Sequence, residues 1–159
     1  MSTPTQIDPR GPRFTAAVTL VVFAVVLVTA PAPVGVALLL LQTALFAVGA
    51  GRGVQHTPTA YAFRTLVRPR LSAPSHLEDA APPRFAQAVG LGFVVVALVG
   101  YLAGVTLLGQ VAAGFALAAA LLNAVFGFCL GCELYLLLHR VIPRNTFVNN
   151  PNTKEEVTA

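Results

Sequence analysis

Charged residues are scarce in this sequence. Only 10% of its 159 residues are Asp, Glu, Lys or Arg, and 56% are hydrophobic. A soluble domain usually has about 25% charged residues. This composition excludes an ordinary soluble domain and predicts an all-α membrane protein.

Cysteine is scarce as well, with two residues in the whole chain. Two cysteines in so apolar a sequence do not make a secreted disulfide scaffold. The basic residues are scattered and form no run that would indicate a nucleic-acid site. We expect membrane lipid as the surrounding partner, no nucleic acid and no cofactor.

Four apolar runs are each long enough to cross a bilayer as a helix, which takes about 17–25 residues. They predict spans at about 14–30, 34–53, 85–105 and 111–138, within a membrane domain covering 14–144. Two short uncharged turns, one containing Pro31 and Pro33 and one at 106–110, pair the spans into hairpins. An arm at 1–13 and a polar tail at 145–159 are expected to be disordered. The loop at 52–84 is polar, with a short amphipathic helix expected over 59–67.

The distribution of basic residues predicts the topology. All ten Lys and Arg residues fall in the arm, in the 52–84 loop or near the C-terminus, and none falls in the two short turns. The positive-inside rule places such segments in the cytoplasm. We expect a multi-pass protein of the inner (plasma) membrane with both termini cytoplasmic.

The two hairpins resemble each other in sequence. Each opens on the same triplet, Pro12-Arg13-Phe14 in the first and Pro83-Arg84-Phe85 in the second. After each hairpin the order Tyr, Val, Pro, Arg recurs, at Tyr61 to Arg70 and again at Tyr135 to Arg144. These matches predict a parallel internal repeat with a pseudo-two-fold axis along the membrane normal. The cysteines occur only in the second copy.

Both cysteines, Cys129 and Cys132, lie near the cytoplasmic end of the fourth run. A Cys-x-x-Cys pair is the smallest dithiol that supports disulfide exchange. We expect the pair on one continuous helix, where side chains three residues apart are about 5–6 Å from each other. A disulfide needs Cβ atoms at about 3.5–4.5 Å, so the helix would have to loosen, and Gly131 is where it can. Gly127 and Gly131 are also expected to allow close helix packing, and Asn123 to bond to a neighbouring helix.

The expected electrostatic field disfavours ionised thiols. In a continuous fourth span the pair lies towards the C-terminal, negative end of the helix dipole. Glu133 adds a like charge, and His139, two turns further on, offsets it only in part. We therefore expect slow alkylation at neutral pH.

Two other roles for the cysteines stay open. Structural zinc takes four thiolate or imidazole ligands, so Cys129, Cys132 and His139 would need His56, His76 or a second subunit to complete a site. Alternatively, the cysteines are small apolar side chains with a structural role only.

The segment from Gly127 to Tyr135 reads G-F-C-L-G-C-E-L-Y, and Arg68 to Leu71 reads R-P-R-L. With the two P-R-F triplets, these motifs resemble an actinobacterial family of small membrane proteins classed as a domain of unknown function, DUF4395. The resemblance covers about residues 8–144. It implies thiol or sulfur metabolism, with a thioredoxin-like or rhodanese-type protein as the soluble partner.

The leading hypothesis is a membrane-bound thiol-redox or sulfur-relay component with its dithiol facing the cytosol. The alternative is a structural or accessory subunit of a membrane complex, with or without self-association. A solute transporter ranks third, because the spans lack the charged residues that mark an ion or proton path. Whether the chain is an enzyme stays open.

Overall fold

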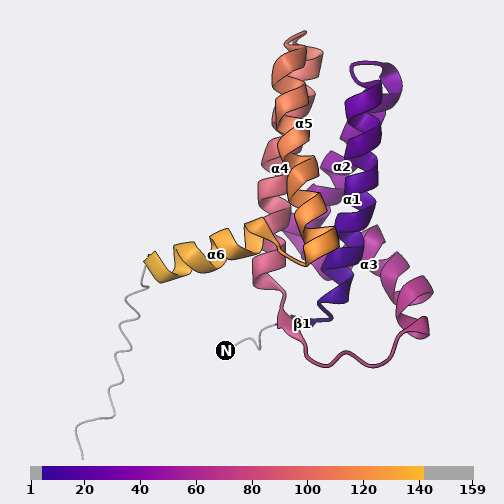
Figure 1. The fold of residues 1–159 in the computed structure, drawn as a ribbon, viewed down its shortest axis with the longest axis vertical. Helices are drawn as coiled ribbons and strands as arrows, with labels where there is room; N and C mark the ends of the chain where they lie inside the picture. The colour runs from indigo at the N-terminus through magenta and orange to yellow at the C-terminus, as the bar shows by residue number, and fades with distance from the viewer. Residues whose placement is uncertain (1–4, 142–159) are drawn as a thin grey trace, which may run out of the picture.

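The computed structural model describes residues 5–141, and four long helices dominate it (Figure 1). They are α1 (Arg10–Thr29), α2 (Pro33–Arg52), α4 (Ala81–Leu102) and α5 (Thr106–Leu121), the last continued by a π-helical turn, η4 (Leu122–Phe126). A 20-residue helix is about 30 Å long, which matches the hydrocarbon thickness of a bilayer. All four are long and apolar enough to cross a membrane, which confirms the predicted class of four-span all-α membrane protein.

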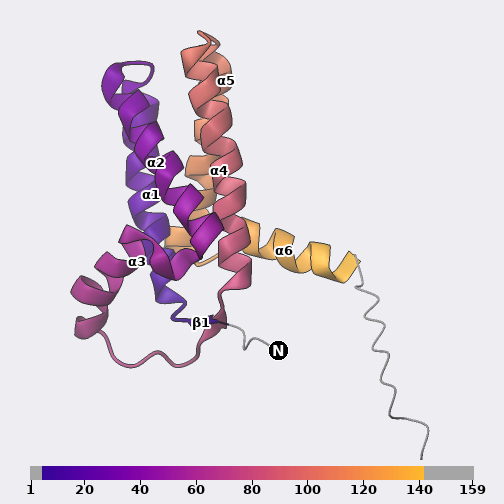
Figure 2. The ribbon, with the colours of Figure 1, turned by 180° about the vertical axis from the view of Figure 1, so that it is seen from behind.

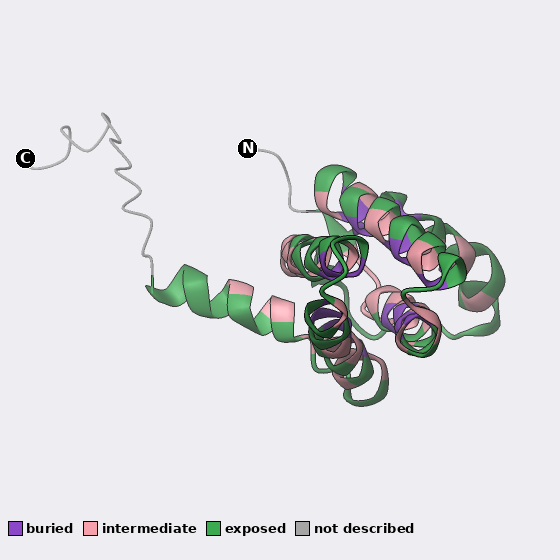
Figure 3. Ribbon diagram, turned by 90° about the horizontal axis from the view of Figure 1, so that it is seen from above, coloured by how far each residue is buried: buried purple, intermediate pink, exposed green. Residues whose placement is uncertain are grey.

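Two helical hairpins, α1–α2 and α4–α5, stand side by side (Figures 1 and 2). α1 and α4 each pack against both α2 and α5, so the four helices form a closed ring. The fully buried residues face the middle of this ring: Phe23, Val26, Leu39, Val94, Ala97 and Ala113. Much of the outer surface is apolar, as at Val28, which is 87% exposed, and at Leu107, which is 71% exposed. Figure 3 shows the same division, with buried positions turned inward and exposed positions outward. Such a surface suits lipid as the solvent, since apolar side chains gain nothing by leaving lipid.

The second short turn lies earlier than predicted. The sequence places it at 106–110, but α5 already begins at Thr106, and Gly104 turns the chain with a φ of 77°. Close packing explains the difference. A methyl group added to Gly100 would lie 2.7 Å from the main-chain nitrogen of Gly109, and one added to Gly109 would lie 2.8 Å from the Tyr101 ring. The two glycines let α4 and α5 touch at the top of the hairpin, so Gly109 belongs to the helix.

Short elements gather at the other end of the bundle, after α2. They are η1 (Val54–His56), α3 (Pro58–Ala62), a π-helical turn η2 (Phe63–Val67) and η3 (Arg68–Arg70). The Thr57 hydroxyl caps α3 by accepting a hydrogen bond from the Ala60 N–H at 3.2 Å. The helix expected over 59–67 is thus found, but Phe63 is buried against Phe14, with ring centroids 5.8 Å apart. Part of its apolar face therefore packs on the bundle, where the sequence suggested lipid headgroups.

The described part of the N-terminal arm is ordered, so the prediction of disorder is wrong for residues 5–13. β1 (Gln6–Ile7) pairs antiparallel with β2 (Glu78–Asp79), and α1 begins at Arg10, four residues before the predicted span. The Asp8 carboxylate accepts hydrogen bonds from the Arg10 main-chain N–H at 3.0 Å and from its guanidinium at 3.1 Å. Burial raises the pKa of Asp8, but these bonds and the Arg10 charge outweigh it and leave the pKa below its usual value. The predicted disorder at 145–159 lies outside the described residues.

Candidate functional site

The fourth span ends at Phe126, not at residue 138 as predicted. After the π-helical turn η4, Gly127 takes a left-handed conformation with a φ of 69°. Its N–H donates to Asn123 O at 3.0 Å, and the N–H of Phe128 donates to Leu122 O at 3.2 Å, which closes the helix end. Only glycine adopts this conformation without strain. A new helix, α6 (Leu130–Val141), then leaves at a steep angle to the bundle (Figure 1).

Arg13, in the first hairpin, contacts the chain at the break between η4 and α6. Its Nη2 donates to the carbonyl oxygen of Val125 at 3.3 Å, and a methyl group on Gly127 would lie 3.5 Å from its Cζ. Carbonyl groups at a helix C-terminus carry partial negative charge, which a guanidinium stabilises. A cation is therefore fixed two residues before Cys129.

The two cysteines lie at the start of α6 and are joined as a disulfide, with their Cα atoms 5.2 Å apart. Cys129 is the residue before the helix, and its sulfur accepts a hydrogen bond from the Cys132 N–H at 3.4 Å. Its carbonyl oxygen accepts the N–H of Glu133 at 3.0 Å, the first bond of the helix. The break at Gly127 brings the two residues within disulfide reach, so the continuous helix and the loosening at Gly131 are both wrong.

The same geometry reverses the direction of the helix dipole that the sequence predicts at the two cysteines. The pair lies at the N-terminal, positive end of α6 and not at the C-terminal end of a long span. N–H groups at a helix N-terminus favour a thiolate. Glu133 is exposed in the first turn of α6 and opposes this effect, as expected of a neighbouring carboxylate.

Gly131 and His139, the other predicted modulators, have structural contacts. A methyl group on Gly131 would lie 2.6 Å from Cα and Cβ of Ala86, so glycine at this position lets α6 rest on α4. The His139 ring packs on Tyr135, with centroids 4.4 Å apart, and Tyr135 in turn packs on Phe85 at 5.7 Å. Within residues 5–141, no three His, Cys, Asp or Glu side chains come together as a metal site, and this includes the zinc set of Cys129, Cys132 and His139.

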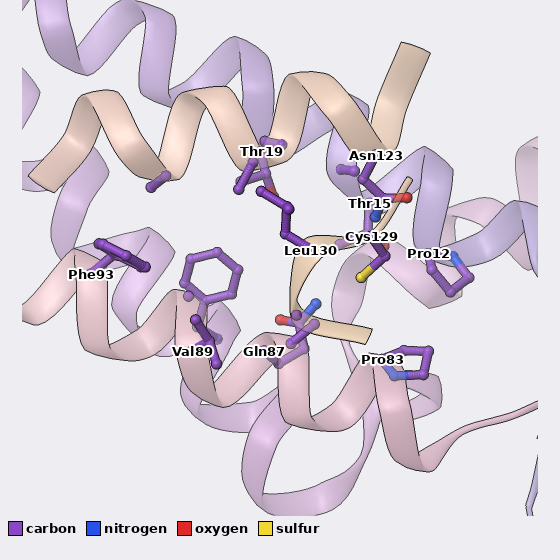
Figure 4. A pocket seen from close by; sticks show the side chains of 18 of the residues that line it. Pro12, Thr15, Thr19, Pro83, Gln87, Val89, Phe93, Asn123, Cys129 and Leu130 are labelled. Atoms are coloured by element: carbon purple, nitrogen blue, oxygen red, sulfur yellow. The ribbon is translucent and has the colours of Figure 1, made fainter. Parts of the chain in front are cut away.

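A cavity of about 440 Å³ lies beside Cys129 (Figure 4). Its walls come from α1, α4 and the end of α5, and Phe46 of α2 and the start of α6 complete the lining. The walls are mostly apolar. The polar side chains on it are Thr15, Thr19, Gln87 and Asn123, and Cys129 adds its sulfur. Cys132 is not among the lining residues, so the two cysteines have different surroundings.

Sequence reasoning did not predict this cavity. The available signal was the presence of polar residues inside apolar spans, and Asn123 was interpreted as a packing residue. Its side chain lines the cavity, and within residues 5–141 it makes no hydrogen bond to a neighbouring helix. Behind the wall, the Thr19 hydroxyl accepts a bond from Gln42 at 3.4 Å, and the buried Gln42 Oε1 has no partner in the described structure.

The comparison with known families matches residues 7–140 to the model described as "Domain of unknown function (DUF4395)". The chain belongs to the DUF4395 family. The match covers most of the chain, and the break, both cysteines and nearly all of α6 lie within it, so the site is part of the DUF4395 domain. No curated protein and no solved structure matches the chain.

Proposed function

We propose that this protein carries out thiol–disulfide exchange at the membrane surface through Cys129 and Cys132. The observation that carries the proposal is the position of the pair at the N-terminus of α6. There the main-chain N–H of Cys132 donates to the Cys129 sulfur across the disulfide. A disulfide in this setting releases a stabilised thiolate when it is attacked, which speeds exchange.

The cytoplasmic side of the membrane is the proposed location of the dithiol. β1, α3 and α6 lie at the same end of the bundle (Figure 1), together with the loop that contributes five of the ten Lys and Arg residues. The positive-inside rule assigns this end to the cytoplasm of the inner membrane. Cytosolic thiols are kept reduced, so the reaction expected there begins with a partner thiol.

The exchange follows from the different surroundings of the two cysteines. Successive helical residues are rotated by about 100°. Cys132 therefore lies on the face of α6 opposite Leu130, Leu134 and Val141, which form its apolar face. A partner thiolate attacks the Cys132 sulfur, and the S–S electron pair leaves on Cys129 as a thiolate. The partner's second thiolate then attacks its own sulfur in the mixed disulfide and releases Cys132. The partner leaves oxidised, and the membrane protein holds the reduced dithiol.

The partner proposed is a soluble thioredoxin-like protein that docks on the basic loop. Arg52, Arg64, Arg68 and Arg70 are exposed in or next to the short elements that follow α2. They favour a partner with an acidic surface near its active cysteine. In the sulfur-relay alternative the partner is a rhodanese-type protein. A thiolate of the reduced pair attacks the outer sulfur of the partner's persulfide, becomes a persulfide itself and releases the partner's thiolate. The accessory-subunit alternative assigns no chemistry to the pair.

We also infer that the chain arose by duplication of one hairpin. Gly53 and Gly127, 74 positions apart, both have positive φ, and each ends the second helix of its hairpin. A helix preceded by a side-chain hydrogen-bond acceptor comes after each glycine: Thr57 precedes α3, which follows η1, and Cys129 precedes α6. In this 74-residue register Cys129 and Cys132 correspond to Gln55 and Pro58, so the first copy has no thiol at the matching positions.

Covalent trapping in cells tests the proposed function. In the reverse direction, the Cys132 thiolate attacks the disulfide of the oxidised partner, and Cys129 resolves the mixed disulfide. The Cys129→Ser variant lacks this resolving thiolate and should retain the partner as a mixed disulfide on Cys132, identifiable by non-reducing electrophoresis and mass spectrometry. The Cys132→Ser variant should retain less, because Cys129 faces the cavity. The double variant is the control. If neither single variant forms an adduct beyond the control, thiol exchange is wrong and the accessory role stands.

A further inference from the structure

We propose that the cavity beside Cys129 binds a lipophilic 1,4-quinone, which takes the electron pair of the reduced dithiol. This inference rests on the proposed exchange function and adds the acceptor that returns the dithiol to the disulfide. Three observations support the quinone: the cavity opens towards lipid, its lining is aromatic with a few polar groups, and Cys129 lies beside it.

The cavity reaches the lipid-facing surface of the bundle. Phe115 lines the cavity and is 61% exposed, and Phe93, Leu130 and Leu134 also line it and are exposed. Phe93 and Phe115 belong to the spans α4 and α5, and Leu130 and Leu134 belong to the start of α6 at the end of the bundle. A ligand that enters here comes from the lipid phase, so it has to be lipophilic.

The lining fits a flat ring with polar edges. Phe46, Phe93 and Phe115 supply aromatic walls, and Phe93 and Phe115 lie with ring centroids 6.3 Å apart. Gln87 and Asn123 supply amide donors near Cys129 (Figure 4), whereas the Thr15 hydroxyl already donates to Thr59 Oγ1 at 3.1 Å. Because Thr19 accepts from Gln42, its own hydroxyl proton is free to donate to a carbonyl. A volume of about 440 Å³ is within the usual range for small-molecule sites, about 300–1,000 Å³.

A lipid acyl chain accounts for the apolar walls but not for the rest. It has no acceptor for the carboxamides of Gln87 and Asn123, which make no side-chain hydrogen bond within residues 5–141 and would lose water without gaining a partner. An acyl chain also does not react with a thiolate, so it leaves the position of the Cys129 sulfur at the cavity unexplained. A quinone carbonyl satisfies the donors, and the quinone ring is a two-electron acceptor next to a two-electron donor.

The quinone oxidises the dithiol in two steps. The Cys129 thiolate adds to a ring carbon of the quinone, and an S–C bond forms while the electron pair moves to the ring oxygens. The Cys132 thiolate then attacks the Cys129 sulfur, so the S–S bond forms as the S–C bond breaks. The two thiol protons end on the ring oxygens. In total, one dithiol and one quinone give one disulfide and one quinol.

The test uses the full chain, reduced and reconstituted in lipid nanodiscs without oxygen, with decylubiquinone and menaquinone-2 as probes. Quinol formation is followed by absorbance and disulfide formation by alkylation and mass spectrometry. We compare Ala119→Trp with Ala118→Trp. Ala119 lines the cavity, whereas its neighbour Ala118 is exposed and does not line it. Exchange with dithiothreitol is measured in parallel.

We expect stoichiometric quinol and disulfide in the wild type and in Ala118→Trp with at least one of the probes. Ala119→Trp should slow quinone reduction by roughly tenfold or more, equivalent to about 1.4 kcal/mol, and leave the dithiothreitol reaction unchanged. Normal exchange with no reduction of either quinone, or equal reduction in both tryptophan variants, would overturn the inference and favour a lipid chain in the cavity. Failure of both reactions would instead contradict the exchange function. The Cys129→Ser/Cys132→Ser protein cannot react, so binding of the quinones to it, measured by native mass spectrometry, tests the cavity's ligand independently of the redox reaction.

Discussion

Arg13 and Arg84 hold the two hairpins together by the same contact made in opposite directions. Arg13 of the first hairpin donates to Val125 O at the end of the second hairpin. Arg84 of the second hairpin donates to Ala50 O at 2.7 Å and Gly51 O at 2.8 Å, at the end of the first. Each arginine comes from a Pro-Arg-Phe triplet, so the sequence match corresponds to a reciprocal contact.

This pair offers a matched test of the field at the dithiol. Arg13→Gln should lower the alkylation rate of the reduced cysteines by roughly two- to threefold, because it removes a cation near the thiolate. Arg84→Gln removes an equivalent contact from the hairpin without cysteines and should leave that rate unchanged while lowering thermal stability. Iodoacetamide kinetics and thermal unfolding measure both effects. Equal alkylation rates in the two variants would rule out a role for the Arg13 charge.

The packing of α6 on α4 depends on Gly131. Gly131→Leu places side-chain atoms against the main chain of Ala86, which cannot give way, and should destabilise the protein by about 1–3 kcal/mol. Gly92→Leu is the control, because a methyl group on Gly92, on the same helix as Ala86, meets nothing within 4 Å. Folded yield in detergent and thermal unfolding compare them. Equal stability would show that α6 does not need this contact.

The position of the cysteines at a helix N-terminus predicts fast alkylation, against the expectation from sequence. Reduced wild-type protein should react with iodoacetamide faster than an unperturbed thiol at neutral pH, with Cys129 faster than Cys132 when each is tested alone. Glu133→Gln should accelerate both further, because it removes a like charge next to the thiolate. Rates are measured against pH. Slow reaction in the wild type would favour the field of a continuous fourth helix.

Acid should weaken the N-terminal clamp. Because Arg10 keeps the pKa of Asp8 below its unfolded value, the carboxylate contributes stability above the unfolded pKa. That contribution is lost as the pH falls through the lower pKa of the folded state. Asp8→Asn should therefore lower the thermal midpoint near neutral pH and flatten its dependence on acid. Arg10→Gln should show part of the same flattening, because it removes the Arg10 charge and side-chain bonds and leaves its main-chain bond and the Arg68 charge, which also lower the pKa of Asp8. An unchanged acid dependence in Asp8→Asn would contradict this account.

Topology can be tested by labelling single cysteines in a protein without Cys129 and Cys132. Val34→Cys, at the turn of the first hairpin, should react with an impermeant maleimide added outside the cell. Ser75→Cys, in the basic loop, should react only after the membrane is opened. The reverse pattern would place the dithiol outside and exclude a cytosolic partner.

The four spans could be predicted from sequence because hydropathy and length alone determine which segments cross a bilayer. The break at Gly127 could not, because the residues around it are as apolar as a span. One signal was present. From Leu130 onward, Glu133 and Arg140 fall on one side of a helix and Leu130, Leu134 and Val141 on the other, which is typical of a helix lying at the membrane surface. Because the break was missed, both the predicted field and the predicted disulfide geometry were wrong.

The cavity could not be predicted for a different reason. Its residues come from five separate helices and a π-helical turn, so it depends on how the helices meet and not on any one segment. Gln87 and Asn123 are noticeable in the sequence only as polar residues in apolar runs. Their side chains share one cavity because α4 and α5 touch closely at Gly100 and Gly109 and α6 crosses the opposite end.

The orientation of α6 limits the shape of anything that reaches Cys132. In the proposed arrangement α6 lies across the end of the bundle with its apolar face towards the lipid, so Cys132 faces away from the membrane, on a nearly flat plane of headgroups and not in a cleft. A soluble protein cannot pass through that plane. A partner in the proposed exchange would therefore need its cysteine on a convex, protruding part of its surface, because the lipid would keep a cysteine at the bottom of a groove out of reach.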